Sequence, residues 1–217
     1  QEGRGNIPEA ERIMGNSFSL LLVISILLTL LLQLFAEPIL FTFGASENTI
    51  GYALDYLRIY SLGTVFVQIT LGMNAYITAQ GFTSVSMKTV LLGAILNTIL
   101  DPIFIFGLGL GVKGAALATI LSQGVSAIWV LRFLTGKQTI LKLRLKNMKL
   151  IPSVILPCLG LGISSFIMVS TESILSISFT SSLARFGGDV AVGAMTVLTS
   201  INQLITMPLS GVCQGGQ

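Results

Sequence analysis

Two carboxylates lie inside long apolar stretches of this 217-residue sequence, Asp101 and Glu172. A charged carboxylate at the centre of a membrane helix costs about 2.5–3.5 kcal/mol on insertion scales, so such a residue is by default a candidate for function. Asn97 precedes Asp101 by four residues, which places both side chains on one helix face. Amide and carboxylate oxygens in this arrangement predict a site for a proton or a cation.

Thr119 is the third candidate for this site. If the helix of Asp101 ends near Phe106 and the next begins near Gly114, both residues lie about five residues, or roughly 8 Å, from the turn. Antiparallel neighbouring helices then bring the Thr119 hydroxyl to the depth of the carboxylate. The sequence therefore predicts a cluster of Asn97, Asp101 and Thr119.

Each of these residues also has a structural interpretation. Asp101 is followed by Pro102, and an Asp-Pro pair is a favourable start for a new helix. Asn97 can equally make a structural hydrogen bond between helices. Thr119 alone is more often a packing residue.

Glu172 lies in a run of hydroxyl residues, Ser170-Thr171-Glu172-Ser173. We expect the hydroxyls to help hold it, and removal from water favours the protonated form, which can exchange its proton when water reaches it. The alternative is a neutral glutamate that is hydrogen-bonded between helices for structure alone.

The elements that must position these residues are membrane helices. Hydrophobic residues make up 53% of the chain and charged residues 10%, against about 25% charged in soluble domains. Six apolar stretches reach the length of about 18 residues that can cross a bilayer. They are expected at residues 13–36, 52–79, 89–106, 114–131, 151–180 and 190–213. The fold class is therefore an all-α integral membrane protein with about six transmembrane helices.

The basic residues predict how these spans are oriented, because loops rich in Lys and Arg stay in the cytoplasm. Nine of the twelve fall on one side: Arg4, Arg12, Lys88, Arg132, Lys137, Lys142, Arg144, Lys146 and Lys149. The other side holds Lys113, Arg185 and, at the head of a span, Arg58. We therefore expect residues 1–12 and the 132–149 loop to be cytoplasmic. The leucines that alternate with this basic run also allow a segment lying on anionic lipid, although a loop that sets topology is favoured.

Several classes of function are excluded. The net charge of +3 is explained by topology and gives no reason to expect a nucleic-acid partner. Histidine is absent, and Cys158 and Cys213 both lie in apolar stretches, so neither zinc nor disulfide frameworks are expected. Residues 109–114 match GxGxxG but join two spans and lack the acidic partner of a dinucleotide site. No nucleophile has a base nearby, so we expect neither an enzyme nor a cofactor other than a coupling ion.

Several segments resemble the multidrug and toxic compound extrusion (MATE) transporters, in particular the bacterial branch with DinF-like and MepA-like members. The resemblance covers the whole chain. Its most specific pieces are residues 10–16 (AERIMGN), 35–38 (FAEP), 56–59 (YLRI), 97–102 (NTILDP), 114–119 (GAALAT) and 208–215 (PLSGVCQG).

The resemblance implies a twelve-helix fold of two lobes around a cavity that opens to alternate sides of the membrane. The six spans would be family helices three to eight, so the chain is expected to be part of a longer polypeptide. Residues 1–136 would then hold four helices of the N-lobe, residues 137–150 a basic cytoplasmic loop between the lobes, and residues 151–217 the start of the C-lobe.

The resemblance further implies efflux of amphipathic, often cationic, organic compounds driven by inward flow of H⁺ or Na⁺. Asn97, Asp101 and Thr119 match the cation or proton site of the N-lobe, with Na⁺ as the bound metal if the coupling ion is Na⁺. Glu172 matches a carboxylate of the seventh helix with a role in coupling or substrate binding. Carboxylates that the family supplies from helices one and ten have no counterpart in this chain.

The expected partners are small drug-like molecules, the coupling cation and membrane lipids, with the protein acting as a monomer in the cell membrane. Two alternatives remain: a flippase for lipid-linked precursors of the same superfamily, and a membrane scaffold that transports nothing. The scaffold gives no reason for buried carboxylates.

Overall fold

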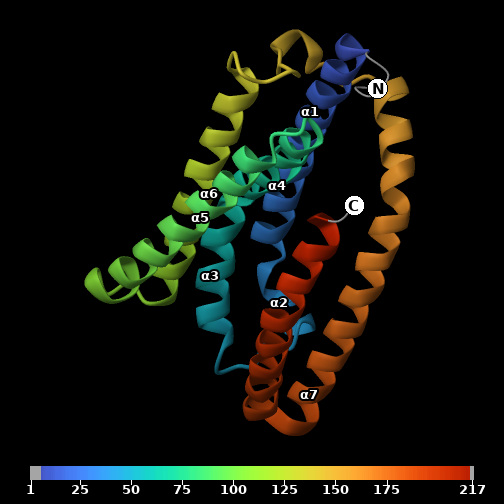
Figure 1. Ribbon diagram of the computed structural model, residues 1–217. Helices are drawn as coiled ribbons and strands as arrows, with labels where there is room; N and C mark the ends of the chain where they lie inside the picture. The colour runs from blue at the N-terminus through green and yellow to red at the C-terminus, as the bar shows by residue number, and fades with distance from the viewer. Residues whose placement is uncertain (1–5, 216–217) are drawn as a thin grey trace. The chain divides into compact units, whose positions relative to one another are not determined.

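The computed structural model describes residues 6–215, without the side chains of residues 210 and 212–215. Arg4 and the side chain of Cys213 therefore lie outside the described residues. Over the described range the chain is helical and contains no strand. The elements are α1 (Ile7–Leu34), α2 (Ala36–Thr42), α3 (Ile50–Leu62), α4 (Thr64–Ala79), α5 (Thr83–Pro102), η2 (Ile103–Gly107), α6 (Val112–Thr135), η3 (Leu145–Asn147) and α7 (Pro152–Gly215) (Figure 1).

The chain forms two compact units. Unit 1 contains residues up to Ala36 together with Tyr52–Phe166, and unit 2 contains Glu37–Gly51 together with the residues from Ile167 onward. Unit 1 therefore includes the 137–150 segment and the first part of α7. The lobe boundaries expected from the resemblance concern the whole transporter and stay a prediction.

Unit 1 is built around α4 and α6. Helix α4 packs against α1, α5 and α6, and α5 packs against α6 (Figure 1). The core between these helices contains the fully buried side chains of Met14, Met73, Ile77, Val130 and Leu134. Many large apolar side chains on the outer faces are exposed, as expected for helices that contact lipid.

Among residues 6–215, four helices are long and apolar enough to cross a membrane, or five when α3 and α4 are counted as one bent span. The bend of 54° falls at Gly63, where a Cβ would lie 2.5 Å from Cγ1 of Ile120. Helix α7 is broken at Gly188, whose φ of 63° and ψ of −167° are not helical. With the two arms of α7 counted separately, each of the six predicted spans has a helical counterpart.

The connection between α5 and α6 lies in the glycine-rich segment at residues 109–114, as predicted from the sequence. Helix α5 ends at Pro102 and passes directly into the π-helical turn η2. Asp101 is therefore in the last turn of a continuous helix, and its alternative interpretation as the N-cap of a new helix is wrong. Gly109 and Gly111, with φ of 66° and 54°, then reverse the chain.

Residues 137–151 pack onto unit 1. The side-chain oxygen of Gln80 accepts hydrogen bonds from the Thr139 hydroxyl and from the amides of Ile140 and Leu141, at 2.8–2.9 Å. Leu141 and Leu143 are buried in the core. The possibility that the leucines of this run rest on lipid is therefore wrong for these two, because the hydrophobic core of unit 1 takes them up.

The same segment is bound to the start of α1 by polar side chains. Glu11, itself buried, accepts a hydrogen bond from the Lys142 amide at 3.0 Å and pairs with the Arg144 guanidinium at 3.1 Å. Asn16 accepts from the Ile151 amide at 2.8 Å and donates to the Asn147 carbonyl at 3.1 Å. The start of α1, the end of α4 and the segment after α6 therefore share one end of unit 1.

Candidate functional site

The structure brings Asn97, Asp101 and Thr119 together between α5 and α6. The amide nitrogen of Asn97 lies 3.2 Å from Oδ1 of Asp101, one turn along α5, and 3.4 Å from the hydroxyl oxygen of Thr119 on α6. The Thr119 hydroxyl itself donates to the carbonyl of Ala115 at 3.0 Å. The three side chains therefore lie together as the sequence predicts, and their role as a site for a proton or cation stays a prediction.

The orientation of the Asn97 amide differs from the sequence expectation. Two oxygen ligands were expected from Asn97 and Asp101, but the NH₂ group of Asn97 faces both neighbours and donates to both. In this orientation Asn97 steadies the carboxylate as a hydrogen-bond donor. A rotation of the amide by 180° would instead present its oxygen to a cation beside Asp101.

The close approach of α6 to the end of α5 depends on Gly114. A Cβ at this position would lie 2.6 Å from the carbonyl oxygen of Phe104 in η2. Only glycine fits this contact without displacing backbone. Gly114 therefore fixes the height at which α6 starts, and with it the depth of Thr119 beside Asn97.

Tyr56 on α3 is a neighbour of this cluster that the analysis of individual residues missed. Its phenol lies near the Thr119 side chain. The rings of Tyr56 and Tyr60 are stacked, with centroids 5.6 Å apart. Its only signal in the sequence was its place in the YLRI segment, since no spacing rule relates α3 to α6.

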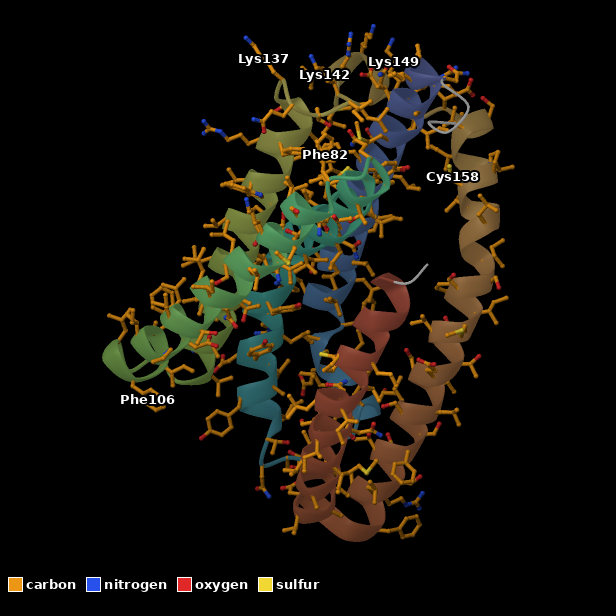
Figure 2. All side chains as sticks on the ribbon, viewed as in Figure 1. Phe82, Phe106, Lys137, Lys142, Lys149 and Cys158 are labelled. Carbon is orange, nitrogen blue, oxygen red and sulfur yellow. The ribbon has the colours of Figure 1, made fainter. Side chains whose placement is uncertain are left out.

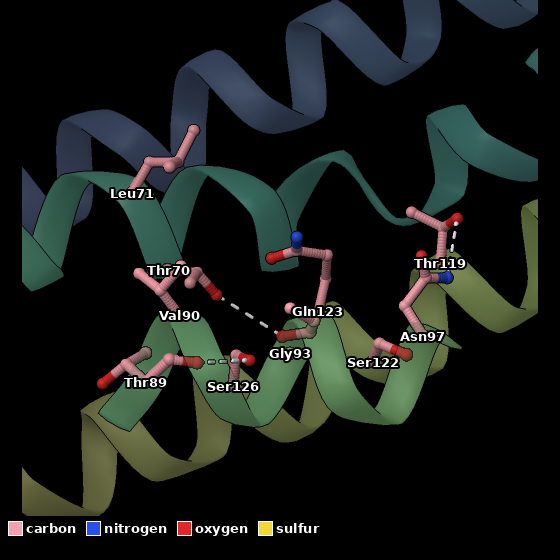
Figure 3. Close-up of a pocket in the computed structure, with 11 residues that line it drawn as sticks. Thr70, Leu71, Thr89, Val90, Gly93, Asn97, Thr119, Ser122, Gln123 and Ser126 are labelled. Carbon is pink, nitrogen blue, oxygen red and sulfur yellow. Dashed lines mark hydrogen bonds between the residues drawn. The ribbon is translucent and has the colours of Figure 1, made fainter. Parts of the chain in front are cut away.

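A hollow of about 230 Å³ adjoins the cluster (Figure 3). Asn97 and Thr119 are among its lining residues, and the others are mostly small or polar. They are Thr70, Leu71, Thr89, Val90, Gly93, Ala94, Ser122, Gln123 and Ser126. The side-chain oxygen of Gln123 is buried without a hydrogen-bond partner among the described residues. A hollow of this size has room for water beside Asn97 and Thr119.

Glu172 belongs to unit 2 and has different surroundings. Its side chain is exposed and borders a hollow of about 670 Å³. The expected support from hydroxyls is wrong for Thr171 and Ser173, which donate to backbone carbonyls of their own helix, Ile167 and Val169. The polar groups that share the hollow with Glu172 come instead from the second arm of α7. They are Thr199, Asn202, Gln203 and Thr206.

The cluster offers one carboxylate, one amide and one hydroxyl. Within residues 6–215 no group of three or more His, Cys, Asp or Glu side chains is placed to hold a metal ion. The proton or cation expected at this cluster stays a prediction.

Comparison with known proteins decides the family. A profile of the MatE family matches residues 1–103. The chain is 31% identical over 199 residues to the multidrug export protein MepA of Staphylococcus haemolyticus (strain JCSC1435), and this match covers 90% of the chain and 44% of MepA. The chain belongs to the MATE family. It spans less than half the length of this curated relative.

Solved MATE structures share the fold. The multidrug transporter DinF-BH, solved in complex with a small-molecule ligand, is 33% identical with a TM-score of 0.83, and the match covers 94% of the chain and 50% of DinF-BH. A MOP superfamily transporter from Pyrococcus furiosus is 26% identical with a TM-score of 0.84, over 96% of the chain and 46% of that protein. For this second transporter, a reversed polarity of the binding pocket is described as suggesting a different function. The chain is thus a multi-pass membrane segment of the MATE transporter fold.

Proposed function

We propose that the protein to which this segment belongs exports amphipathic, often cationic, organic compounds by antiport against H⁺ or Na⁺. The observation that supports this most directly is the cluster of Asn97, Asp101 and Thr119 between two membrane helices. Multidrug export by MepA and the ligand complex of the multidrug transporter DinF-BH support the class of substrate.

Asp101 is proposed as the group whose charge changes during the cycle. A charged carboxylate inside a membrane span is costly, and binding of H⁺ or Na⁺ removes its negative charge. Binding can shift the transporter between its two conformations only to the extent that the ion binds one of them more tightly. Alternating access would arise from this difference in affinity.

Either ion is compatible with Asn97, because its amide can turn. Its NH₂ group donates to Asp101 and to Thr119, and both bonds persist if the other carboxyl oxygen is protonated. Coordination of Na⁺ by the Asn97 oxygen requires the amide to turn and to lose both bonds. Glu172 in unit 2 is proposed to act in coupling or in substrate binding.

The end of unit 1 that holds the 137–149 segment is proposed to be cytoplasmic. Figure 2 shows Lys137, Lys142 and Lys149 together at this end and Phe106 at the opposite end of unit 1. The opposite end holds Lys113, which pairs with Asp55 at 3.4 Å. The positive-inside rule assigns the end that is richer in lysine to the cytoplasm.

The test is efflux of ethidium from cells that express the complete gene. We expect Asp101→Asn to abolish efflux, because the amide cannot take up a proton or neutralise a cation. The H⁺ and Na⁺ gradients are also collapsed separately in the wild type. We expect the collapse of one of them to abolish efflux, and that gradient identifies the coupling ion. Membrane levels of each variant are measured by immunoblot.

A matched control is Asp55→Asn, which makes the same chemical change in an exposed ion pair of the same unit. Exposed ion pairs contribute little to stability, so this variant should export ethidium normally. Normal efflux by Asp101→Asn, or efflux that ignores both gradients, would show that the proposed coupling is wrong. If an anionic dye is exported and ethidium is not, the proposed coupling still stands but the proposed charge of the substrate is wrong.

A further inference from the structure

A second hollow, of about 510 Å³, lies at the end of unit 1 where α5 begins and α6 ends. Its lining combines three cationic side chains, Lys88, Arg132 and Lys137, with the aromatic rings of Trp129 and Phe133. None of its lining residues is acidic. The two ion pairs found among the described residues, Lys113–Asp55 and Arg144–Glu11, involve none of these three cations.

We propose that this hollow, hereafter the basic pocket, binds the phosphate group of an anionic phospholipid from the adjoining leaflet. Three uncompensated cations around one hollow give a strong preference for an anion. Basic pockets between transmembrane helices at the cytoplasmic side are suited to anionic lipid headgroups. The inference requires only a multi-pass membrane protein and does not depend on the proposed transport activity.

The position of the pocket matches the depth of a headgroup. Trp129 is 42% exposed, and tryptophan is enriched where hydrocarbon meets the headgroup region. The ring of Phe133 packs edge-on against Phe82, with centroids 5.2 Å apart, which holds this wall of the pocket in place. Helix α5 begins and helix α6 ends at this end of the unit, so their dipoles oppose each other and the attraction for an anion comes from the three cationic side chains.

Apolar stripes on both helices continue from the pocket toward the middle of the membrane. Leu91 and Ile95 follow Lys88 at helical spacing on α5 and are exposed by 47% and 57%. On α6, Ile128 and Val125 precede Arg132 by about one and two turns and are exposed by 65% and 42%. These stripes offer acyl chains a surface below the cations, which a soluble phosphate compound would not use.

The test uses full-length protein, purified and stripped of lipid in detergent, with Trp129 as the reporter. Lipids with brominated acyl chains quench tryptophan on contact, and subtraction of the Trp129→Phe variant isolates the signal of Trp129. At about fivefold per basic side chain near the headgroup, three cations give a roughly 100-fold preference for phosphatidylglycerol over phosphatidylcholine. We expect a preference of this order in the wild type.

Two triple variants separate the pocket from general basic charge. K88Q/R132Q/K137Q should lose the preference, whereas K142Q/K146Q/K149Q removes the same charge from the neighbouring segment and should retain it. K88R/R132K/K137R keeps the charges and should retain the preference, which shows that loss in the glutamine variant is not a folding defect. The side chains of Lys88, Arg132 and Lys137 are all exposed, so their replacement should leave the helix packing intact.

Equal quenching by both lipids in the wild type would overturn the proposal. So would a preference that survives K88Q/R132Q/K137Q, or one that K142Q/K146Q/K149Q abolishes to the same extent. Glycerol 3-phosphate provides the headgroup without acyl chains, and at millimolar concentration it should fail to displace phosphatidylglycerol. Displacement would show that the pocket binds soluble phosphates, and the assignment to a lipid would then be wrong.

Discussion

Replacement of Gln80 by methionine should release the 139–143 segment from unit 1. The Gln80 oxygen accepts three hydrogen bonds, from the Thr139 hydroxyl and from the amides of Ile140 and Leu141. Methionine fills a similar volume but offers no strong acceptor. The donors of this segment would therefore lose their shared partner while Leu141 remains buried.

The expected cost follows from which donors water can reach. The Ile140 side chain is exposed, so its amide can be rehydrated, and the Thr139 hydroxyl already has a second acceptor in the Leu141 carbonyl at 2.9 Å. The buried Leu141 amide has no such alternative among the described residues, and an unsatisfied buried donor costs about 1–3 kcal/mol. With the weakened bonds of its neighbours, we expect a local loss of about 3 kcal/mol, which corresponds to an opening equilibrium roughly 100-fold more favourable.

Hydrogen exchange of the amides of residues 139–143 in the full-length protein measures this opening directly, because local opening controls exchange. Gln138→Met is the matched control, since Gln138 is exposed in the same segment and its side chain makes no hydrogen bond among the described residues. Unchanged protection in Gln80→Met would refute the reasoning. An equal loss of protection in Gln138→Met would show that the effect is not due to the buried acceptor.

Two glycine positions give further predictions. Gly114→Ala should lower the free energy of unfolding by about 1–3 kcal/mol and weaken coupled efflux, because the added Cβ meets the Phe104 carbonyl. Gly107→Ala is the control, since its added Cβ has its nearest neighbour 4.0 Å away, and it should change neither stability nor efflux. Gly188→Ala should destabilise the α7 turn by about 1–3 kcal/mol, because φ 63° with ψ −167° is accessible essentially only to glycine. Gly193→Ala is the control for Gly188→Ala: its added Cβ lies in open space and its φ is not positive, so it should be neutral or slightly stabilising. Thermal melting measures all four variants. Equal melting temperatures within the Gly114/Gly107 pair or within the Gly188/Gly193 pair would contradict the prediction for that pair.

The sequence determined the class of protein and most of its spans. Apolar stretches of membrane length and the scarcity of charge predicted transmembrane helices, since the bilayer admits little else. Asn97 and Asp101 share a face because helical periodicity is local, and the glycine-rich turn after Phe106 made the depth of Thr119 calculable from residue counts. Short sequence segments also indicated the MATE family, to which the match with MepA assigns the chain.

The tertiary structure decided how helices distant in sequence approach one another. Tyr56 on α3 lies near Thr119 on α6, and the Gln80 side chain binds a segment some 60 residues away. Lys88 and Arg132 line one pocket only because α5 packs antiparallel to α6. Periodicity fixes which residues share a face of one helix, but the partner of that face depends on non-local contacts such as those at Gly63 and Gly114. The orientation of the Asn97 amide is likewise set by its neighbours on two helices, so no local rule could have assigned it.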